Sequence, residues 1–290
     1  MEKSYLRIFV DTLFVSTILL LVFNYSYWKL IKYEKNYINK PKGFFPLGNS
    51  GRYMSNYRVW PAPKILVCSE FENTVNFLDL FFNGGVNKTY DEIFSKSRFV
   101  NLKNALMNDI SKTSWQLILF TQNPMKRFLD NFLDYCSMYS RYETESSPFC
   151  FYCNGEINCF LTNLFDYLKN KSWVKQRFEP SLRDRLFAPQ FWKCNLKLDF
   201  SHYNIIQIDN GDNFYEKLLN IIRNYTSPSI DKTIVYDEAD KIYSSLQIRR
   251  NKTLFNFYEN LLTKNEYLLT KFVTIYFFDY YIFSYEIPYF

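Results

Sequence analysis

Two polar loops contain the residues best suited to bind an anionic ligand. Residues 69–74 follow the apolar run 64–68, and residues 121–127 follow the apolar run 115–120. We predict each run as a buried strand and the amphipathic stretch after each loop as a helix. Helix N-termini at the carboxyl ends of parallel strands attract phosphate groups. The two loops are therefore the candidate site for a phosphorylated ligand.

The rest of the chain repeats this pattern of strand and helix. Residues 203–208 form a third apolar run, and the turn at Asn210 leads into an amphipathic stretch at 214–223. Strands that alternate with helices predict an α/β fold with a central parallel sheet covered on both faces. Charged residues interrupt the aromatic tail 254–283, so we expect helices packed on the sheet there rather than a membrane span.

Composition argues against several classes of function. Of the 290 residues, 48% are hydrophobic, as in an ordinary globular protein. The net charge is +6, from 35 Lys and Arg minus 29 Asp and Glu, and the basic residues are spread along the chain, so nucleic-acid binding is not favoured. The 7 glycines argue against a glycine-rich phosphate loop, and the single histidine, His202, argues against a histidine metal site.

The amino-terminal end contains one long apolar run. Residues 8–23 are apolar apart from Asp11 and several hydroxyl residues, and aromatic residues follow it. We interpret the run as a signal-anchor transmembrane helix, with a cleaved signal peptide and a buried core helix as the alternatives. The predicted divisions of the chain are a short tail at 1–7, the anchor at 8–23, a stem at 24–60 and one folded domain at 61–290.

The signals for the cellular compartment of this domain disagree. Lysines are more numerous after the anchor than before it, which by the positive-inside rule alone would place the domain in the cytoplasm. The lumen is favoured by six cysteines, an even count, and by N-glycosylation sequons that begin at Asn24, Asn87, Asn224 and Asn251. The cysteine cluster at 150–159 could ligate zinc, but it lacks a nearby histidine and a second Cys-x-x-Cys pair, so we favour disulfides.

Several segments carry motifs in an order that is found in a known family. Residues 121–132 read TQNPMKRFLDNF, similar to the pattern R-[DN]-P-x-x-R-F-x-S-x-F. A cysteine-rich segment at 150–160 precedes residues 184–194, which are similar to D-x-H-F-x-P-Q-x-W-x-C, and an aromatic segment closes the chain at 275–288. From Lys64 onward, the chain thus resembles the carbohydrate sulfotransferases of the chondroitin and dermatan type.

The resemblance implies a P-loop-like three-layer sandwich in a Golgi enzyme, a type II single-pass membrane protein with a luminal catalytic domain. Such enzymes transfer a sulfo group from PAPS (3′-phosphoadenosine-5′-phosphosulfate) to a sugar hydroxyl without a metal. In this family a lysine contacts the 5′-phosphosulfate, an arginine and a serine contact the 3′-phosphate, and a histidine is often the base. The implied partners are a glycosaminoglycan-like glycan acceptor, the membrane and, in an oligomer, active relatives, but no nucleic acid.

Four positions depart from the family pattern. Glu70 stands at the lysine position, four residues before Thr74, and Leu186 stands at the histidine position. Gln122 replaces the arginine and Asp130 replaces the serine. A carboxylate repels a phosphosulfate, and a leucine side chain cannot accept a proton.

These departures leave two functions open. The expected donor-binding residues are Asn73, Thr74, Gln122, Arg127 and Asp130, and no metal ligand is expected. Glu70 is the candidate base, and the positive charge would come from Lys64, Lys126 or Arg127, whereas a relocated role for His202 is less favoured. The first function is a carbohydrate O-sulfotransferase with a degenerate site for PAPS or its product PAP (3′-phosphoadenosine-5′-phosphate). The alternative is a catalytically inactive paralogue that binds a glycan or a partner protein in the lumen.

Overall fold

The structure is a computed structural model that describes residues 45–48, 57–60, 64–68, 98–99, 115–137, 148–173, 178–194, 196, 203–209, 214, 216–218, 220–221, 237 and 251–288. The chain divides into two compact units, Met1–Phe44 and Phe45–Phe290, and all described residues belong to the second. The predicted anchor at 8–23 lies outside the described residues. Among the helices that are described, none has both the length and the apolar character needed to cross a bilayer.

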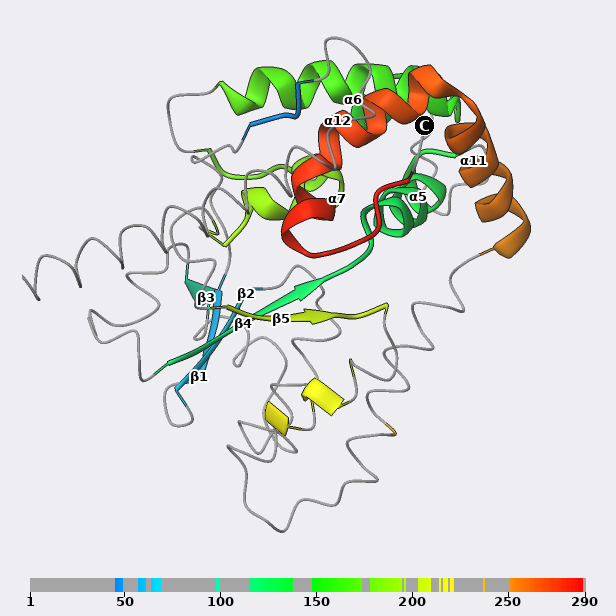
Figure 1. Ribbon diagram of the computed structural model, residues 1–290. Helices are drawn as coiled ribbons and strands as arrows, with labels where there is room; N and C mark the ends of the chain where they lie inside the picture. The colour runs from blue at the N-terminus through cyan, green and yellow to red at the C-terminus, as the bar shows by residue number, and fades with distance from the viewer. Residues whose placement is uncertain are drawn as a thin grey trace, which may run out of the picture. The chain divides into compact units, whose positions relative to one another are not determined.

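Five described strands form one sheet in the order β3-β1-β2-β4-β5 (Figure 1). β2, β4 and β5 are parallel to one another, as the sequence predicts, and all residues of β2 are buried. The α/β class is therefore confirmed. The strands are β1 Tyr57–Trp60, β2 Ile65–Cys68, β3 Arg98–Phe99, β4 Gln116–Thr121 and β5 Tyr203–Gln207.

The expectation of a wholly parallel sheet needs a correction, because β1 runs antiparallel to both β2 and β3. Four residues separate Trp60 from Ile65, and a parallel pair needs a crossover of a dozen or more, so this connection permits only an antiparallel pair. β1 and Leu47 belong to the predicted stem, yet β1 is part of the sheet. Leu47 is buried, and its backbone N–H donates to the Thr274 carbonyl at 3.0 Å. The folded unit thus includes residues before 61.

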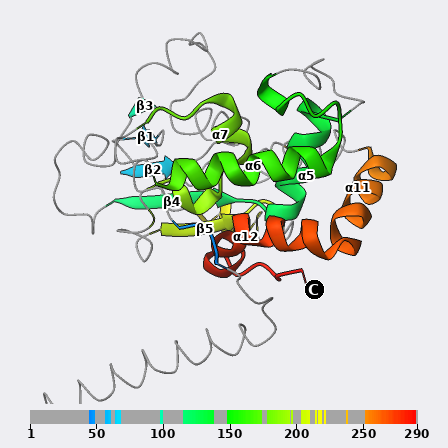
Figure 2. The same cartoon turned by 90° about the horizontal axis from the view of Figure 1, so that it is seen from above.

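The α-helices α5, α6, α7, α11 and α12 lie on one side of the sheet (Figures 1 and 2). On the other side lie the helical residues 214, 216–218 and 220–221, where the ring of Phe214 meets that of Phe120 edge-on. α11 and α12 confirm the helices expected in the aromatic tail, while the helix expected after the first loop lies outside the described residues. The α-helices are α5 Pro124–Tyr135, α6 Ile157–Ser172, α7 Leu182–Phe187, α11 Lys252–Lys264 and α12 Glu266–Ile282.

Phe128 is the centre of an aromatic core in this helical layer. Its fully buried ring lies with centroid distances of 5.4 to 6.2 Å from five other rings. Burial of such a ring contributes about 2–3 kcal/mol, and edge-to-face contacts add to it. The packing therefore fixes α5 against α6, α7 and α12. The five rings are those of Phe132, Phe160, Phe187, Phe272 and Tyr276.

All six cysteines form disulfides, Cys68–Cys194, Cys136–Cys150 and Cys153–Cys159. The disulfide interpretation of the cysteine cluster is confirmed, and its cysteines are not available as zinc ligands. The first disulfide joins the carboxyl end of β2 to the residues after the short 3₁₀ helix η3 (Gln190–Trp192). The second joins the end of α5 to the 3₁₀ helix η2 (Pro148–Cys150).

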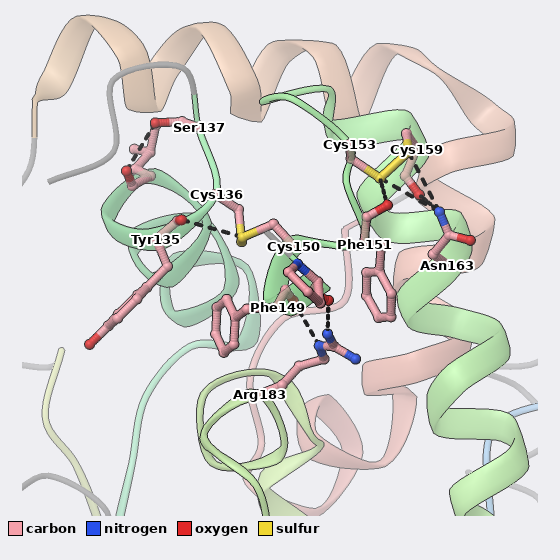
Figure 3. Close-up of a disulfide and its surroundings, with 12 residues drawn as sticks. Tyr135, Cys136, Ser137, Phe149, Cys150, Phe151, Cys153, Cys159, Asn163 and Arg183 are labelled. Atoms are coloured by element: carbon pink, nitrogen blue, oxygen red, sulfur yellow. Dashed lines mark hydrogen bonds between the residues drawn. A yellow bond between two sulfur atoms is a disulfide. The ribbon is translucent and has the colours of Figure 1, made fainter. Parts of the chain in front are cut away.

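The half-buried Arg183 of α7 supports the cysteine-rich loop (Figure 3). Its guanidinium donates to the carbonyls of Pro148 and Phe149 and lies 3.9 Å from the centroid of the Phe151 ring. Phe151 and Tyr152 adopt left-handed φ angles of 58° and 57°, which cost L-residues about 1–2 kcal/mol each. The disulfides and Arg183 hold the loop in this conformation.

The disulfides differ in the length of chain that they close, which predicts different effects on stability. In the loop-entropy model the 126-residue separation of Cys68 and Cys194 is worth about 5 kcal/mol, and the 6-residue separation of Cys153 and Cys159 about 2 kcal/mol. Replacing the first pair by alanine should therefore lower the free energy of unfolding more than replacing the second, as measured by urea denaturation. Equal losses, or a larger loss for the shorter loop, would contradict this order.

Candidate functional site

The predicted loop at 121–127 is fully described. Residues 121–123 connect the carboxyl end of β4 to the N-terminus of α5, and residues 124–127 form the first turn of that helix. Asn123 is the N-cap of α5, and its Oδ1 accepts hydrogen bonds from the backbone N–H groups of Met125 at 3.0 Å and Lys126 at 3.3 Å. Pro124 occupies the first helical position, where a backbone donor would have no partner within the helix. The first turn of α5 is therefore satisfied by the chain itself.

Asp209 follows β5 and places its carboxylate beside this helix N-terminus. Both carboxylate oxygens accept from the backbone N–H of Asn123, at 3.1 and 3.2 Å, and Lys126 Nζ lies 3.9 Å away. Anions are favoured at helix N-termini because the N–H groups and the helix dipole point toward them. In this protein, an anion from its own chain lies there.

Tyr285 completes the group from the segment after α12. Its hydroxyl donates to Asp209 Oδ1 at 3.1 Å and lies 3.2 Å from Thr121 Oγ1. Burial, with the negative charge of Asp209 as the second cause, raises the pKa of Tyr285 well above its usual value. Tyr285 therefore remains a neutral donor that joins the ends of β4 and β5. Sequence reasoning missed both residues, although a carboxylate directly after a predicted strand was a signal for Asp209.

Gln122 and Asp130, at the family's arginine and serine positions, contact each other. Gln122 Nε2 donates to Asp130 Oδ2 at 3.3 Å. The backbone of Gln122 is paired with Gln190, which accepts from its N–H at 2.9 Å and donates to its carbonyl at 2.8 Å. The structure thus brings these two predicted residues together, with the amide of one directed at the carboxylate of the other.

Arg127 is buried, and its positive charge is directed at backbone carbonyls. Nη1 donates to the carbonyl of Ala188 at 2.9 Å and Nη2 to that of Arg185 at 2.8 Å. One turn along α5, Asn131 donates to the carbonyl of Leu186 at 2.8 Å. Leu186 is half-buried at the family's histidine position. These bonds tie α5 to the segment 185–188.

Asp279 of α12 holds the 3₁₀ helix η3, which follows the segment 185–188. Its fully buried carboxylate accepts from the backbone N–H groups of Gln190 and Phe191, both at 2.8 Å. Burial raises the pKa of Asp279 to about 6, although these two hydrogen bonds and the positive charge of Arg127 act in the opposite direction. Gln190 is therefore fixed through its backbone by Asp279 and through its side chain by Gln122.

The remaining predicted residues lie elsewhere. Lys64 precedes β2, and its carbonyl accepts from Gln116 N–H at the start of β4. It therefore lies at the amino-terminal ends of these strands, whereas the loop at 121–123 lies at the carboxyl end of β4. Lys126 belongs to the site, and its side chain is 39% exposed. The other predicted residues, Glu70, Asn73, Thr74 and His202, lie outside the described residues.

Comparisons with known proteins agree with the motifs. The model of the family described as "Sulfotransferase family" matches residues 52–286. Three proteins of Caenorhabditis elegans are similar: "Uncharacterized protein C18B2.2" (25% identical over 62% of this chain), "Putative sulfotransferase vep-2" (30% over 43%) and "Carbohydrate sulfotransferase chst-1" (25% over 49%). The matches cover 50%, 40% and 46% of these relatives, so the chain spans about half of their length or less. No solved structure gives a significant match.

The bonds of Arg127 predict a structural role that can be separated from ligand binding. Replacing Arg127 with Met should lower the free energy of unfolding by about 3 kcal/mol, because two carbonyls would lose a charged donor. The exposed neighbour is a matched control, and Lys126→Met should cost less than about 1 kcal/mol. Urea denaturation of both variants measures the difference. A loss for Arg127→Met no larger than for Lys126→Met would show that Arg127 does not tie α5 to this segment.

The raised pKa of Asp279 predicts a stability that declines as pH increases. The folded protein keeps the proton up to about pH 6, whereas the unfolded chain releases it near the ordinary value of 3.8. Stability from this group is therefore complete below about pH 4 and lost as pH rises through 6, and the shift corresponds to about 3 kcal/mol.

Urea denaturation between pH 4 and 7 measures this slope for the parent protein and for Asp279→Asn. The slope should be smaller in Asp279→Asn and unchanged in the control Asp166→Asn, which alters an exposed carboxylate. A slope that Asp279→Asn leaves intact would assign the pH dependence to other groups.

Proposed function

Because the chain belongs to the sulfotransferase family, we propose that it transfers a sulfo group from PAPS to a hydroxyl group of a glycan. Family membership supports sulfo transfer and PAPS as the donor. The glycan acceptor is supported by the motif resemblance and by the printed name of one relative, a carbohydrate sulfotransferase. In the reaction the S–O bond to the donor phosphate breaks, a bond from sulfur to the acceptor oxygen forms, and a base takes the hydroxyl proton.

One observation carries the proposal: the two motif segments form a single bonded unit at the carboxyl ends of β4 and β5. Gln190 and Gln122 are 68 residues apart and exchange two hydrogen bonds. Arg127 joins the same segments through two more. In open α/β sheets, ligands bind at this edge. The residues that resemble the family motifs thus lie where a ligand site is expected.

The described residues do not fit a 3′-phosphate in the way that the family pattern implies. Gln122 is a neutral amide that is hydrogen-bonded to Asp130, where the family has an arginine. The guanidinium of Arg127 is directed at backbone carbonyls. The carboxylates of Asp130 and Asp209 would repel a phosphate group. We therefore propose a weak donor site, with Lys126 and the loop residues Asn73 and Thr74 as the remaining candidates.

Glu70 is the proposed general base. Leu186 has no proton acceptor, and a carboxylate in the loop after β2 could take the proton of an acceptor hydroxyl. The same charge would oppose the donor phosphosulfate, so Glu70 should favour the chemical step and weaken donor binding.

We also propose a type II Golgi protein with this domain in the lumen, attached through the anchor at 8–23. The three disulfides support an oxidising compartment. Activity towards glycosaminoglycan-like acceptors and assembly with active relatives belong to the same proposal.

The proposal predicts binding of PAP and a specific effect of Glu70→Gln. Calorimetric titration of PAP into the full chain should give a measurable affinity, and PAP at 100 times its dissociation constant should stabilise the fold by about 2.7 kcal/mol. Glu70→Gln should lower sulfo transfer from labelled PAPS to desulfated glycosaminoglycans by about 100-fold or more, because a general base contributes at least that factor. It should not weaken PAP binding.

Glu72→Gln is the matched control, because it removes a carboxylate from the same loop two residues away and should leave transfer unchanged. Absence of PAP binding to the folded chain would contradict the proposed function. PAP binding with full transfer activity in Glu70→Gln would contradict only the role of Glu70 as the base.

A further inference from the structure

The sequon Asn251-Lys252-Thr253 is a feature that the proposed activity does not use. It lies at the start of α11, and all three of its side chains are exposed. An exposed Asn with a hydroxyl residue two positions later is the acceptor pattern for N-linked oligosaccharides. We propose that Asn251 is an N-glycosylation site of this protein. The inference does not depend on whether the chain transfers sulfo groups.

The N-cap geometry of Asn251 is compatible with a glycan. Its Oδ1 accepts a hydrogen bond from the backbone N–H of Leu254 at 3.2 Å, which caps α11. An N-glycan is attached through Nδ2, and no hydrogen bond joins that atom to another described residue. Because the linkage keeps the side-chain carbonyl, the glycosylated residue can still cap the helix.

The chemistry of the modification requires a lipid-linked donor. Asn251 Nδ2 attacks the anomeric carbon of the first sugar of a polyprenyl-diphosphate oligosaccharide. The new C–N bond replaces the C–O bond to the diphosphate, which leaves with the lipid, and a base of the transferring enzyme takes the amide proton. No electron transfer takes place.

The disulfides give an independent reason to expect this donor. All six cysteines are paired, including the 126-residue link between Cys68 and Cys194. Such bonds form in the oxidising secretory compartments, where N-linked oligosaccharides are also added. A chain that acquires these disulfides is thus exposed to the glycosylation machinery.

Asn265 offers a matched comparison within the same chain. It is also exposed and caps α12, and its Oδ1 accepts from the backbone N–H of Leu268 at the same distance, 3.2 Å. It differs in the residue two positions later, which is Tyr267 instead of a threonine. Asn251 and Asn265 therefore share their exposure and cap geometry, and only Asn251 has the sequon.

The test is expression of the full chain in a eukaryotic secretory host, followed by enzymatic release of N-glycans in ¹⁸O-labelled water. Release converts a glycosylated Asn into a labelled Asp, which peptide mass spectrometry assigns to a position. We expect the label at position 251 in the majority of molecules and none at 265. Thr253→Ala should abolish the label at 251, and Thr253→Ser should retain it.

Two further variants keep the test independent of folding. Asn251→Asp retains an N-cap acceptor and should fold without a glycan at this position. Tyr267→Thr completes a sequon at Asn265 and should add a second labelled position. An unlabelled Asn251 in the full chain purified from this host overturns the proposal, whether or not Asn265 gains a glycan in Tyr267→Thr. A label at 251 that persists in Thr253→Ala overturns it as well, because the sequon would not be its cause.

Discussion

The hydrogen bonds of Gln190 are the constraint on which the arrangement at the carboxyl ends of β4 and β5 depends. Its side chain pairs with both backbone groups of Gln122, much as a neighbouring strand would. Its backbone N–H is bonded to the buried carboxylate of Asp279. One residue thus fixes the loop at 121–123, η3 and α12 relative to one another. The aromatic contacts of Phe128 in turn hold α5, which follows this loop, against α7 and α12.

The charges around this unit limit the anions that it can bind. Asp209 lies at the N-terminus of α5. Asp130 lies on α5 and accepts a hydrogen bond from the side chain of Gln122. Two like charges 4 Å apart repel by about 4 kcal/mol at an effective dielectric constant of 20. A phosphate group beside Asn123 would meet this repulsion from Asp209. Strong donor binding would therefore require cations from outside the loop at 121–123, or displacement of Asp209.

Local features of the sequence were sufficient to predict β2, β4, β5 and the start of α5, but they predicted neither β1 nor the long-range contacts. The strands β2, β4 and β5 and the start of α5 follow from apolar runs, polar turns and the Asn123-Pro124 pair, which are local signals. β1 was missed because the short segment Tyr57–Trp60 has no strong pattern of its own and becomes a strand by pairing with β2. The bonds of Asp279 and Tyr285 join residues 76 to 164 positions apart, which no local pattern specifies. Arg127 was identified as a cation near the loop, but its burial against the carbonyls of 185–188 depends on the tertiary fold.

Bonds within the protein explain which family positions this chain keeps and which it has changed. Asn123, Arg127 and Gln190 match the family patterns, and each has bonds to the protein itself: a helix cap, two carbonyls or the backbone of Gln122. Their loss would leave buried polar groups without partners, which costs about 1–3 kcal/mol for each group. Positions that the family uses for the donor or the acceptor carry no such structural penalty. Leu186 packs half-buried with its backbone carbonyl bonded to Asn131, and an amide at position 122 finds a partner in Asp130. The scaffold can therefore persist while the ligand-facing chemistry changes, and the fold alone does not determine how tightly the donor is bound.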